Sequence, residues 1–168
     1  MKLEKSLGHL TYSTLVHPGD NWEQMRSSLE EFVPQIKQRL GVTGKFGVSL
    51  RISGSSAKTL SESADERVSL KAFLDENGLY VFTINAFPFG PFKGQRVMEQ
   101  VYEPDWTSQQ RIEYTKSIAD ILVEITDADV SPSIQTAPLA FAPNVSDENY
   151  IAKFTTGVFE VISHLYHL

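Results

Sequence analysis

Hydrophobic and polar residues alternate with a period that changes several times along the chain, which predicts a succession of strands and helices. Residues 8–17 mix β-branched and aromatic side chains and end in His-Pro-Gly, a pattern typical of a strand followed by a turn. From Asp20 or Asn21 onward, apolar residues recur every three or four positions, which predicts a helix that ends at Gly41. Pro34 lies inside this helix, and we expect it to kink the helix or split it in two.

The middle of the chain repeats this alternation of strand and helix. Residues 45–53 alternate apolar with polar side chains, which predicts a second strand with one apolar face. A polar linker follows, and then a helix over about 65–77 that ends at Gly78. Residues 79–87 predict a third strand, in which we expect Phe82 to face the helices.

A long connection separates the third strand from the rest of the chain. Residues 88–106 are rich in proline, glycine and aromatic residues and far exceed the usual ~2–6 residues of such a connection. Thr107 and Gln110 then form a capping-box pattern at the start of a helix. A fourth strand is expected near 133–139, and a last helix from about Ser146. The chain therefore alternates strand and helix four times.

Four strand–helix units predict an α/β fold with a parallel sheet and right-handed connections. Two folds fit, namely half of a (β/α)₈ TIM barrel and an open doubly wound sheet. Strands of a doubly wound sheet are almost continuously apolar, whereas these strands carry polar residues on one face. Those polar residues are Ser49, Arg51, Thr83, Asn85 and Gln135. We therefore predict a half-barrel with parallel strand order 1-2-3-4, and an order of 2-1-3-4 would contradict it.

The length of the chain bears on how complete the barrel is. The 168 residues are the size of one domain. A full barrel typically needs about 250 residues, so we expect residues 1–168 to be the N-terminal half of a truncated TIM barrel. The last helix stops without a glycine cap or a polar tail, which fits this expectation. Open parallel edges invite association, so we expect the half-barrel to pair with another half or with itself.

The composition of the chain argues against several classes of binding partner and bears on its cellular compartment. The net charge of −6 argues against an electrostatic nucleic-acid binder, which needs a surplus of basic residues. The absence of cysteine excludes disulfides, thiolate metal sites and cysteine nucleophiles. The sequence shows no signal peptide and no apolar run near the ~18 residues that span a bilayer. We therefore expect a cytoplasmic protein without a transmembrane segment.

Barrel enzymes carry their reactive groups at the carboxyl ends of the strands, where this chain places four candidates. His17 is a candidate acid–base catalyst because histidine titrates near neutral pH, although a turn histidine that bonds the backbone fits equally well. Arg51 needs an anion, which is either substrate or a carboxylate of the protein. Asn85 and Gln135 are expected to bind substrate, with a turn-forming role and a supporting hydrogen bond as their alternatives.

The long loop adds three candidates for substrate binding, Phe89, Phe92 and Lys93. The two phenylalanines either cover a ligand as a lid or plug the top of the barrel. Lys93 either positions substrate or is a solvated surface residue. The sequence contains no HExxH motif, and no acidic residue at a strand end pairs with His17, so we expect no metal ligands within this chain.

Four segments of the chain resemble the N-terminal half of the metabolite traffic protein EboE family. They are GHLTYSTLVHPGDNW, FGVSLRIS, GLYVFTINAFPFGPFKGQRVMEQVYEPDW and SIQTAPLAF. That family is similar to xylose isomerase-like, sugar phosphate isomerase/epimerase-type TIM barrels. The resemblance implies a role in moving a prenylated or aromatic secondary-metabolite precursor out of the cytoplasm, alongside other proteins of the same export pathway. It also implies a divalent metal in the full-length protein, held by Glu, Asp, His and Glu ligands on later strands.

Three functions stay open at this point. The first is a binding or hand-off protein for a small-molecule metabolite, which performs no chemistry. The second is a metal-dependent isomerase or epimerase acting on a small polyol or cyclic substrate. The third is a fragment that is inactive alone. The presence of the Glu, Asp, His and Glu set on downstream strands would favour the enzyme.

Overall fold

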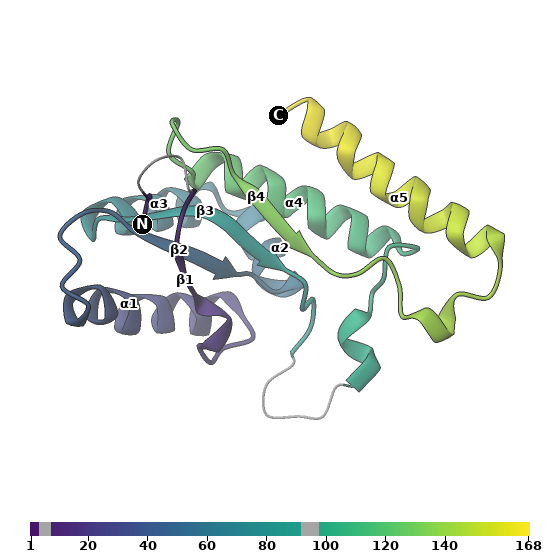
Figure 1. The fold of residues 1–168 in the computed structure, drawn as a ribbon, viewed down its shortest axis with the longest axis horizontal. Coiled ribbons are helices and arrows are strands. Elements are labelled where there is room, and N and C mark those ends of the chain that lie inside the picture. The colour runs from purple at the N-terminus through teal and green to yellow at the C-terminus, as the bar shows by residue number, and fades with distance from the viewer. Residues whose placement is uncertain (4–7, 92–97) are drawn as a thin grey trace.

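A parallel sheet of four strands forms the centre of the protein (Figure 1). The computed structural model describes residues 1–3, 8–91 and 98–168. The strands are β1 (Thr11–Ser13), β2 (Phe46–Arg51), β3 (Leu79–Ala86) and β4 (Ser133–Thr136). Their order in the sheet is β1-β2-β3-β4, and every neighbouring pair is parallel. This order confirms the predicted α/β half-barrel and differs from the 2-1-3-4 order of the doubly wound alternative.

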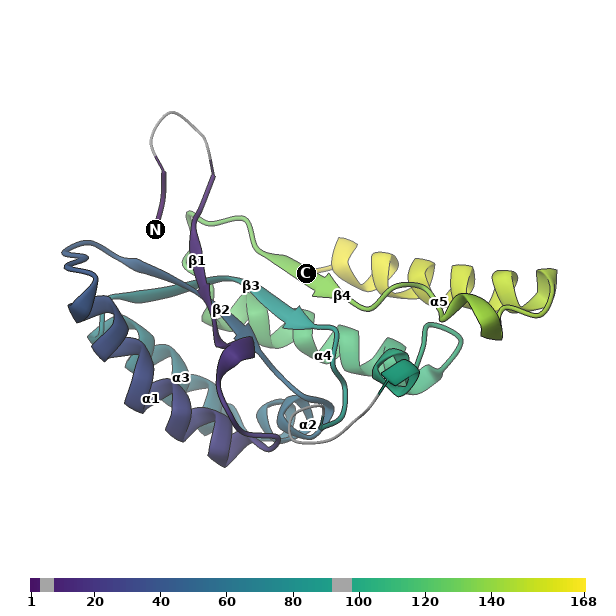
Figure 2. The ribbon, with the colours of Figure 1, turned by 60° about the horizontal axis from the view of Figure 1, so that its bottom comes forward.

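Four helices cover one face of this sheet (Figure 2). The α-helices are α1 (Trp22–Arg39), α2 (Gly54–Glu62), α3 (Ala64–Glu76), α4 (Gln109–Ile125) and α5 (Glu148–Tyr166). Three short 3₁₀ helices are η1 (Thr14–Val16), η2 (Met98–Tyr102) and η3 (Ala142–Asn144). Apolar side chains of α1 to α4 share one buried core with Val48, Leu50, Val81 and Ile84 of the sheet. The helices therefore stabilise one side of the sheet because apolar side chains are buried between them and the strands. We call the opposite side of the sheet the inner face.

The last helix, α5, packs on α4 rather than on the main core (Figure 1). A small second cluster joins Trp106, Ile112 and Val161. Gly157 allows the close approach, because a Cβ atom there would lie 2.5 Å from the carbonyl oxygen of Trp106. The rest of the α5 surface is largely exposed.

Two predictions about helices need correction. The expected polar linker before α3 is itself a helix, α2, which Ser53 caps by accepting a hydrogen bond from the Ser56 amide at 3.2 Å. Its apolar contacts come from Ala57 and Leu60, so the serine-rich sequence hides the helical stripe. The helix α1 runs through Pro34 as one element and is not split. Proline costs a helix one hydrogen bond, and the packing of the turns on either side of it outweighs this cost.

The helix ends follow the predicted chemistry with one exception. Asn21 caps α1 by accepting a hydrogen bond from the Gln24 amide at 3.0 Å, as predicted. Gly78 follows α3 with a φ of 59°, the left-handed conformation that glycine adopts without strain. The cap of α4 is Ser108 and not Thr107. The hydroxyl of Thr107 instead donates to Asp105 Oδ1 at 2.7 Å, so the predicted capping box is wrong.

A bulge in β3 changes which way its side chains face. Val81 pairs with Val48 and Thr83 pairs with Ser49, so Phe82 is an extra residue between them. The Phe82 ring lies 4.9 Å from the ring of His9 between centroids, outside the helix-side core. The expectation that Phe82 faces the helices is therefore wrong, because strict alternation holds only without a bulge.

Candidate functional site

The inner face carries polar side chains in two rows that cross the strands. Paired positions of neighbouring strands point to the same side of a sheet, so the register defines each row. The hydroxyl row is Ser49, Thr83 and Ser133, and the polar row is Arg51, Asn85 and Gln135. The polar row lies two residues further along each strand, toward the carboxyl ends where barrels carry their sites. The structure thus brings three of the predicted site residues together.

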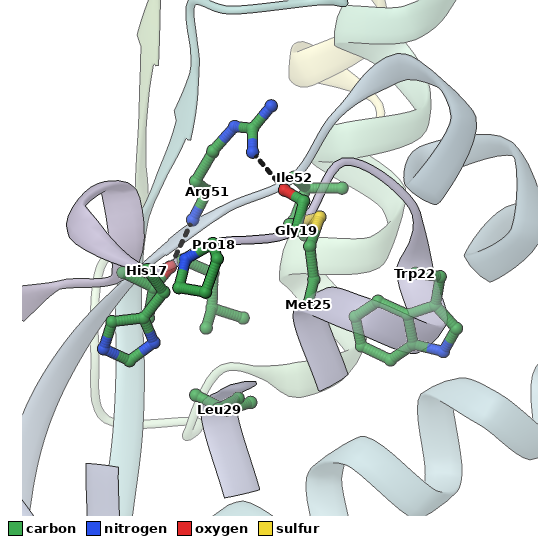
Figure 3. Close-up of a pocket in the computed structure, with 10 residues that line it drawn as sticks. His17, Pro18, Gly19, Trp22, Met25, Leu29, Arg51 and Ile52 are labelled. Carbon is green, nitrogen blue, oxygen red and sulfur yellow. Dashed lines mark hydrogen bonds between the residues drawn. The ribbon is translucent and has the colours of Figure 1, made fainter. Parts of the chain in front are cut away.

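Arg51 is buried at the carboxyl end of β2, with 2% of its surface exposed. Its guanidinium donates to the carbonyl oxygen of Gly19 at 2.6 Å (Figure 3). It also donates to Asp20 Oδ1 at 3.2 Å and to the carbonyl oxygen of Gly90 at 3.4 Å. The carboxylate of Asp20 therefore pairs with the buried charge of Arg51. Arg51 joins the loop after β1 to the loop after β3 at the edge of the site.

Asn85 and Gln135 differ in their burial and in their hydrogen bonds to the rest of the protein. Asn85 is buried, and its Oδ1 accepts a hydrogen bond from the Phe87 amide at 3.1 Å, the pattern of a turn at a strand end. Gln135 lies on the exposed strand β4 and makes no side-chain hydrogen bond to the part of the chain that the structure describes. The Ser133 hydroxyl donates to Thr83 Oγ1 at 3.0 Å in the row below. Gln135 is therefore the member of the polar row with donors and an acceptor turned to solvent.

His17 lies on the other side of the sheet. Its Nε2 is 2.9 Å from the hydroxyl of Tyr12, and its ring meets the ring of Phe32 on α1 edge-on, at 5.3 Å between centroids. In Figure 3 the His17 ring and the Arg51 guanidinium extend in opposite directions. The geometry does not bring His17 to the polar row, and its catalytic role stays a prediction.

A small cavity lies beside His17, between the β1–α1 loop and α1. Its apolar wall includes Trp22, Met25 and Leu29 (Figure 3). Its volume is about 20 Å³, enough for one water molecule. A cavity of this size does not hold a metabolite.

The loop residues lie partly outside the described part of the chain. Phe92 and Lys93 fall within residues 92–97, which are outside the described residues. Phe89 packs on the helix side, with its ring 5.1 Å from the Tyr114 ring in an edge-on contact. A Cβ atom at Gly54 would lie 2.3 Å from the Phe89 ring, so the start of α2 fits closely against it. Phe89 thus anchors the beginning of the loop, away from the polar row.

Arg111 on α4 is a buried residue that sequence reasoning missed. None of its surface is exposed, and it donates to the carbonyl oxygens of Ala86 at 2.8 Å, Phe87 at 3.2 Å and Pro104 at 2.7 Å. Burial lowers the pKa of Arg111, and the nearby Tyr114 opposes this shift. The guanidinium fixes the point where the chain leaves β3 and the point where it returns to α4. An arginine in a helical pattern gives no sign of this role, because its partners are backbone atoms distant in sequence.

Three aromatic rings line up next to the polar row. The Phe87 ring is 5.9 Å from the Tyr102 ring, and the Tyr102 ring stacks on the Phe141 ring at 5.5 Å. All three side chains are half-buried, and we call them the aromatic wall. Phe87 directly follows β3, which places the wall beyond the carboxyl end of this strand. Spacing in the sequence did not reveal this wall, because its members come from three separate segments.

The described residues offer no group of three or more His, Asp or Glu side chains that would hold a metal ion. The expectation of metal ligands on later strands stays a prediction. No helix within the described ranges is both long and apolar enough to cross a membrane.

Comparisons with known proteins find a similar solved structure but no family. No protein-family model and no curated protein matches it. A similar solved structure is the crystal structure of a xylose isomerase domain protein from Planctomyces limnophilus, with a TM-score of 0.48 and 15% sequence identity. The match covers 79% of this chain and 46% of that chain. This chain therefore spans less than half of that protein.

Proposed function

We propose that this chain is a binding half-barrel that holds a small metabolite on its inner face and hands it on without chemistry. The observation that carries the proposal is that the polar row and the aromatic wall both lie toward the carboxyl ends of the strands. His17, the predicted acid–base residue, contacts Tyr12 and Phe32 on the helix side, which favours a role without chemistry for the inner face. The resemblance to EboE proteins supports a metabolite traffic role for such a surface, with other proteins of the export pathway as partners.

The chemistry of the surface favours a hydroxylated ring as its ligand. Aromatic rings stack on flat apolar faces, and the aromatic wall presents Tyr102 and Phe141 in a stacked pair. Gln135 adds an amide that both donates and accepts, and Thr83 and Ser133 add hydroxyl groups. Binding sites commonly combine an apolar wall with a few convergent polar groups in this way. An aromatic secondary-metabolite precursor has the matching features.

A metal-dependent isomerase or epimerase is the second candidate, favoured by the two rows of polar groups. Such rows suit a polyol or a cyclic sugar-like substrate, which is rich in hydroxyl groups. The metal would supply Lewis-acid polarisation of a carbonyl or hydroxyl, from ligands on strands outside this chain. In that case the present chain supplies substrate contacts through Asn85 and Gln135 and is inactive alone.

Ligand-detected NMR on the intact chain separates these proposals. The probes are 4-hydroxybenzyl alcohol, which has the hydroxylated aromatic ring, and D-xylose, which has hydroxyls without an aromatic face. We expect saturation transfer to the aromatic probe and weaker transfer to the sugar. The substitution Gln135→Ala should weaken binding of the aromatic probe about three- to ten-fold, the value of one or two hydrogen bonds.

The control is Gln38→Ala, which removes an exposed glutamine from α1 on the helix side of the sheet. It should leave binding unchanged. Equal losses in both variants, or no transfer to the aromatic probe, would contradict the hand-off proposal. Stronger transfer to D-xylose than to the aromatic probe would favour the isomerase.

A further inference from the structure

The two stacked rings of the aromatic wall come from separate loops. Tyr102 belongs to the loop before α4, residues 98–108, and Phe141 belongs to the loop before α5, residues 137–147. Their ring centroids are 5.5 Å apart, and both side chains are half-buried. A single ring pair gains less free energy than the ordering of several loop residues costs. Other contacts must therefore hold the two loops together.

A buried carboxylate, that of Asp105, joins the loop before α4 to the start of α5. Only 2% of the surface of Asp105 is exposed. Its Oδ1 accepts hydrogen bonds from the amide of Thr107 at 2.9 Å and from the hydroxyl of Thr107 at 2.7 Å. Its Oδ2 accepts a hydrogen bond from the hydroxyl of Tyr150, in the first turn of α5. Tyr150 is thus a donor to Asp105 that comes from beyond the loop before α5.

The charge of Asp105 makes this contact stronger than a hydrogen bond between neutral groups. Burial lowers the pKa of Arg111, and the negative charge of Asp105 is among those that oppose this shift, so the two charges attract each other. The hydrogen bond to Asp105, together with burial, raises the pKa of Tyr150 to about 12. Its hydroxyl therefore remains a donor at neutral pH, and hydrogen bonds to ionised acceptors are roughly twice as strong as neutral ones.

Phe141 lies between two points at which its loop is held. Before it in the chain, the carbonyl oxygen of Ala137 accepts a hydrogen bond from the Trp106 indole at 3.2 Å. The carbonyl oxygen of Leu139 accepts one from the Trp106 amide at 3.4 Å. After it, Tyr150 is bonded to Asp105. The loop before α5 is therefore fixed to the loop before α4 on both sides of the Phe141 ring.

A weaker contact also lies on the Tyr150 side of Phe141. The side-chain amide of Asn144 donates to Glu103 Oε1 at 3.4 Å, and both residues are exposed. This distance is near the limit for a hydrogen bond, and water competes for exposed polar groups. The hydrogen bond from Tyr150 to Asp105 is therefore the stronger of these two contacts.

We propose that Tyr150 is a positioning residue for the aromatic wall. Its hydrogen bond to Asp105 holds the loop before α5 against the loop before α4 and thereby keeps Phe141 stacked on Tyr102. The inference rests on the proposed function, because it concerns the same binding surface. It assigns recognition of the ligand's ring to the wall, whereas the hydroxyl row and the polar row, which lie on the strands, recognise its hydroxyl groups independently.

The substitution Tyr150→Phe tests the proposal, because it removes the hydroxyl and keeps the ring that meets Phe154 edge-on. We expect nuclear Overhauser effects between the rings of Tyr102 and Phe141 in the wild type, and their loss in the variant. Binding of 4-hydroxybenzyl alcohol should weaken roughly three- to ten-fold. Saturation transfer to D-xylose should stay the same, since the rows on the strands are untouched. General loss of structure would instead reduce transfer to both probes.

The matched control is Tyr166→Phe, which removes the same group from the same helix. Tyr166 is 86% exposed, so its variant should keep both the ring contacts and the affinity for the aromatic probe. Circular dichroism should show that both variants are folded. Unchanged ring contacts in Tyr150→Phe, unchanged affinity for the aromatic probe, or equal losses for the two probes would overturn the positioning role.

This proposal and the binding function fail in distinguishable ways. A wild-type chain without transfer to 4-hydroxybenzyl alcohol, whose ring contacts are still lost in Tyr150→Phe, would reject the binding function and retain the positioning of the rings. A wild-type chain that binds this probe, with ring contacts and affinity unchanged in Tyr150→Phe, would reject the positioning role and retain the binding function.

Discussion

Two buried arginines, Arg51 and Arg111, organise the carboxyl edge of the sheet through backbone carbonyls. Arg51 holds the loops after β1 and β3, and Arg111 holds the exit from β3 and the entry to α4. A buried guanidinium satisfies several carbonyls at once, since it presents five donors in a fixed plane. The loops around the candidate surface are thus held by two buried arginines, of which Arg51 also belongs to the polar row.

The substitution Arg111→Met tests this role at the level of one residue. It retains most of the side-chain volume but leaves the carbonyls of Ala86, Phe87 and Pro104 without their donor. Each unsatisfied buried group costs about 1–3 kcal/mol, so we expect a loss of about 3 kcal/mol or more in the free energy of unfolding. Urea denaturation measures this loss.

Arg39→Met is the control for this experiment, because Arg39 is exposed in the last turn of α1. Its effect should stay within about 0.5 kcal/mol, as for most surface substitutions. Similar stabilities of the two variants would show that the Arg111 hydrogen bonds do not hold the loop.

Single residues were predicted from the sequence only where strand alternation applied. Alternation placed Arg51, Asn85 and Gln135 on one face, and the register agrees. The same alternation failed at Phe82, because the bulge adds one residue to β3. Arg111 could not be predicted, since backbone carbonyls leave no trace in the sequence.

At the scale of elements, a network of ion pairs joins the residue before β2, the helix α3 and the residues just after α4. Asp127, just after α4, accepts hydrogen bonds from Lys45 at 2.6 Å and from Lys71 of α3 at 3.0 Å. Lys45 immediately precedes β2. The hydrogen bond from Lys45, with that from Lys71, lowers the pKa of Asp127 below its usual 3.8. The network therefore stabilises the end of the molecule opposite to the candidate site.

The substitution Asp127→Asn should lower the free energy of unfolding by about 1 kcal/mol at pH 7. Because the folded pKa of Asp127 is depressed, its contribution is present above the unfolded pKa and is lost as the pH falls through the folded pKa. The stability difference between wild type and variant should thus be constant from pH 7 to about 5 and shrink below about 4. Urea denaturation across this range measures the difference. A difference that grows on acidification would contradict the role of the ionised carboxylate.

Elements with a long apolar period were predicted well, and short ones were not. The stripes of α1 and α5 extend over several turns, so both helices were found with nearly their observed bounds. The helix α2 was missed because only Ala57 and Leu60 face the core among its serines. The aromatic wall was also missed, since tertiary contacts between separate loops create it.

At the scale of the whole molecule, one face of the sheet is covered by helices and the other is polar. The helix-covered face holds the main core, which accounts for the stability of the chain. The inner face carries the hydroxyl row and the polar row. Among the described residues, both outer strands have unpaired edges. The half-barrel class was predictable from the four alternations and the polar face, whereas the bulge in β3 and the aromatic wall were not.

Saturation-transfer NMR with 4-hydroxybenzyl alcohol tests the proposed binding surface most directly. We predict transfer from the wild-type chain to this probe and roughly three- to ten-fold weaker binding in the Gln135→Ala variant, with Gln38→Ala unchanged. No transfer to the probe, or equal losses in the two variants, would contradict the account.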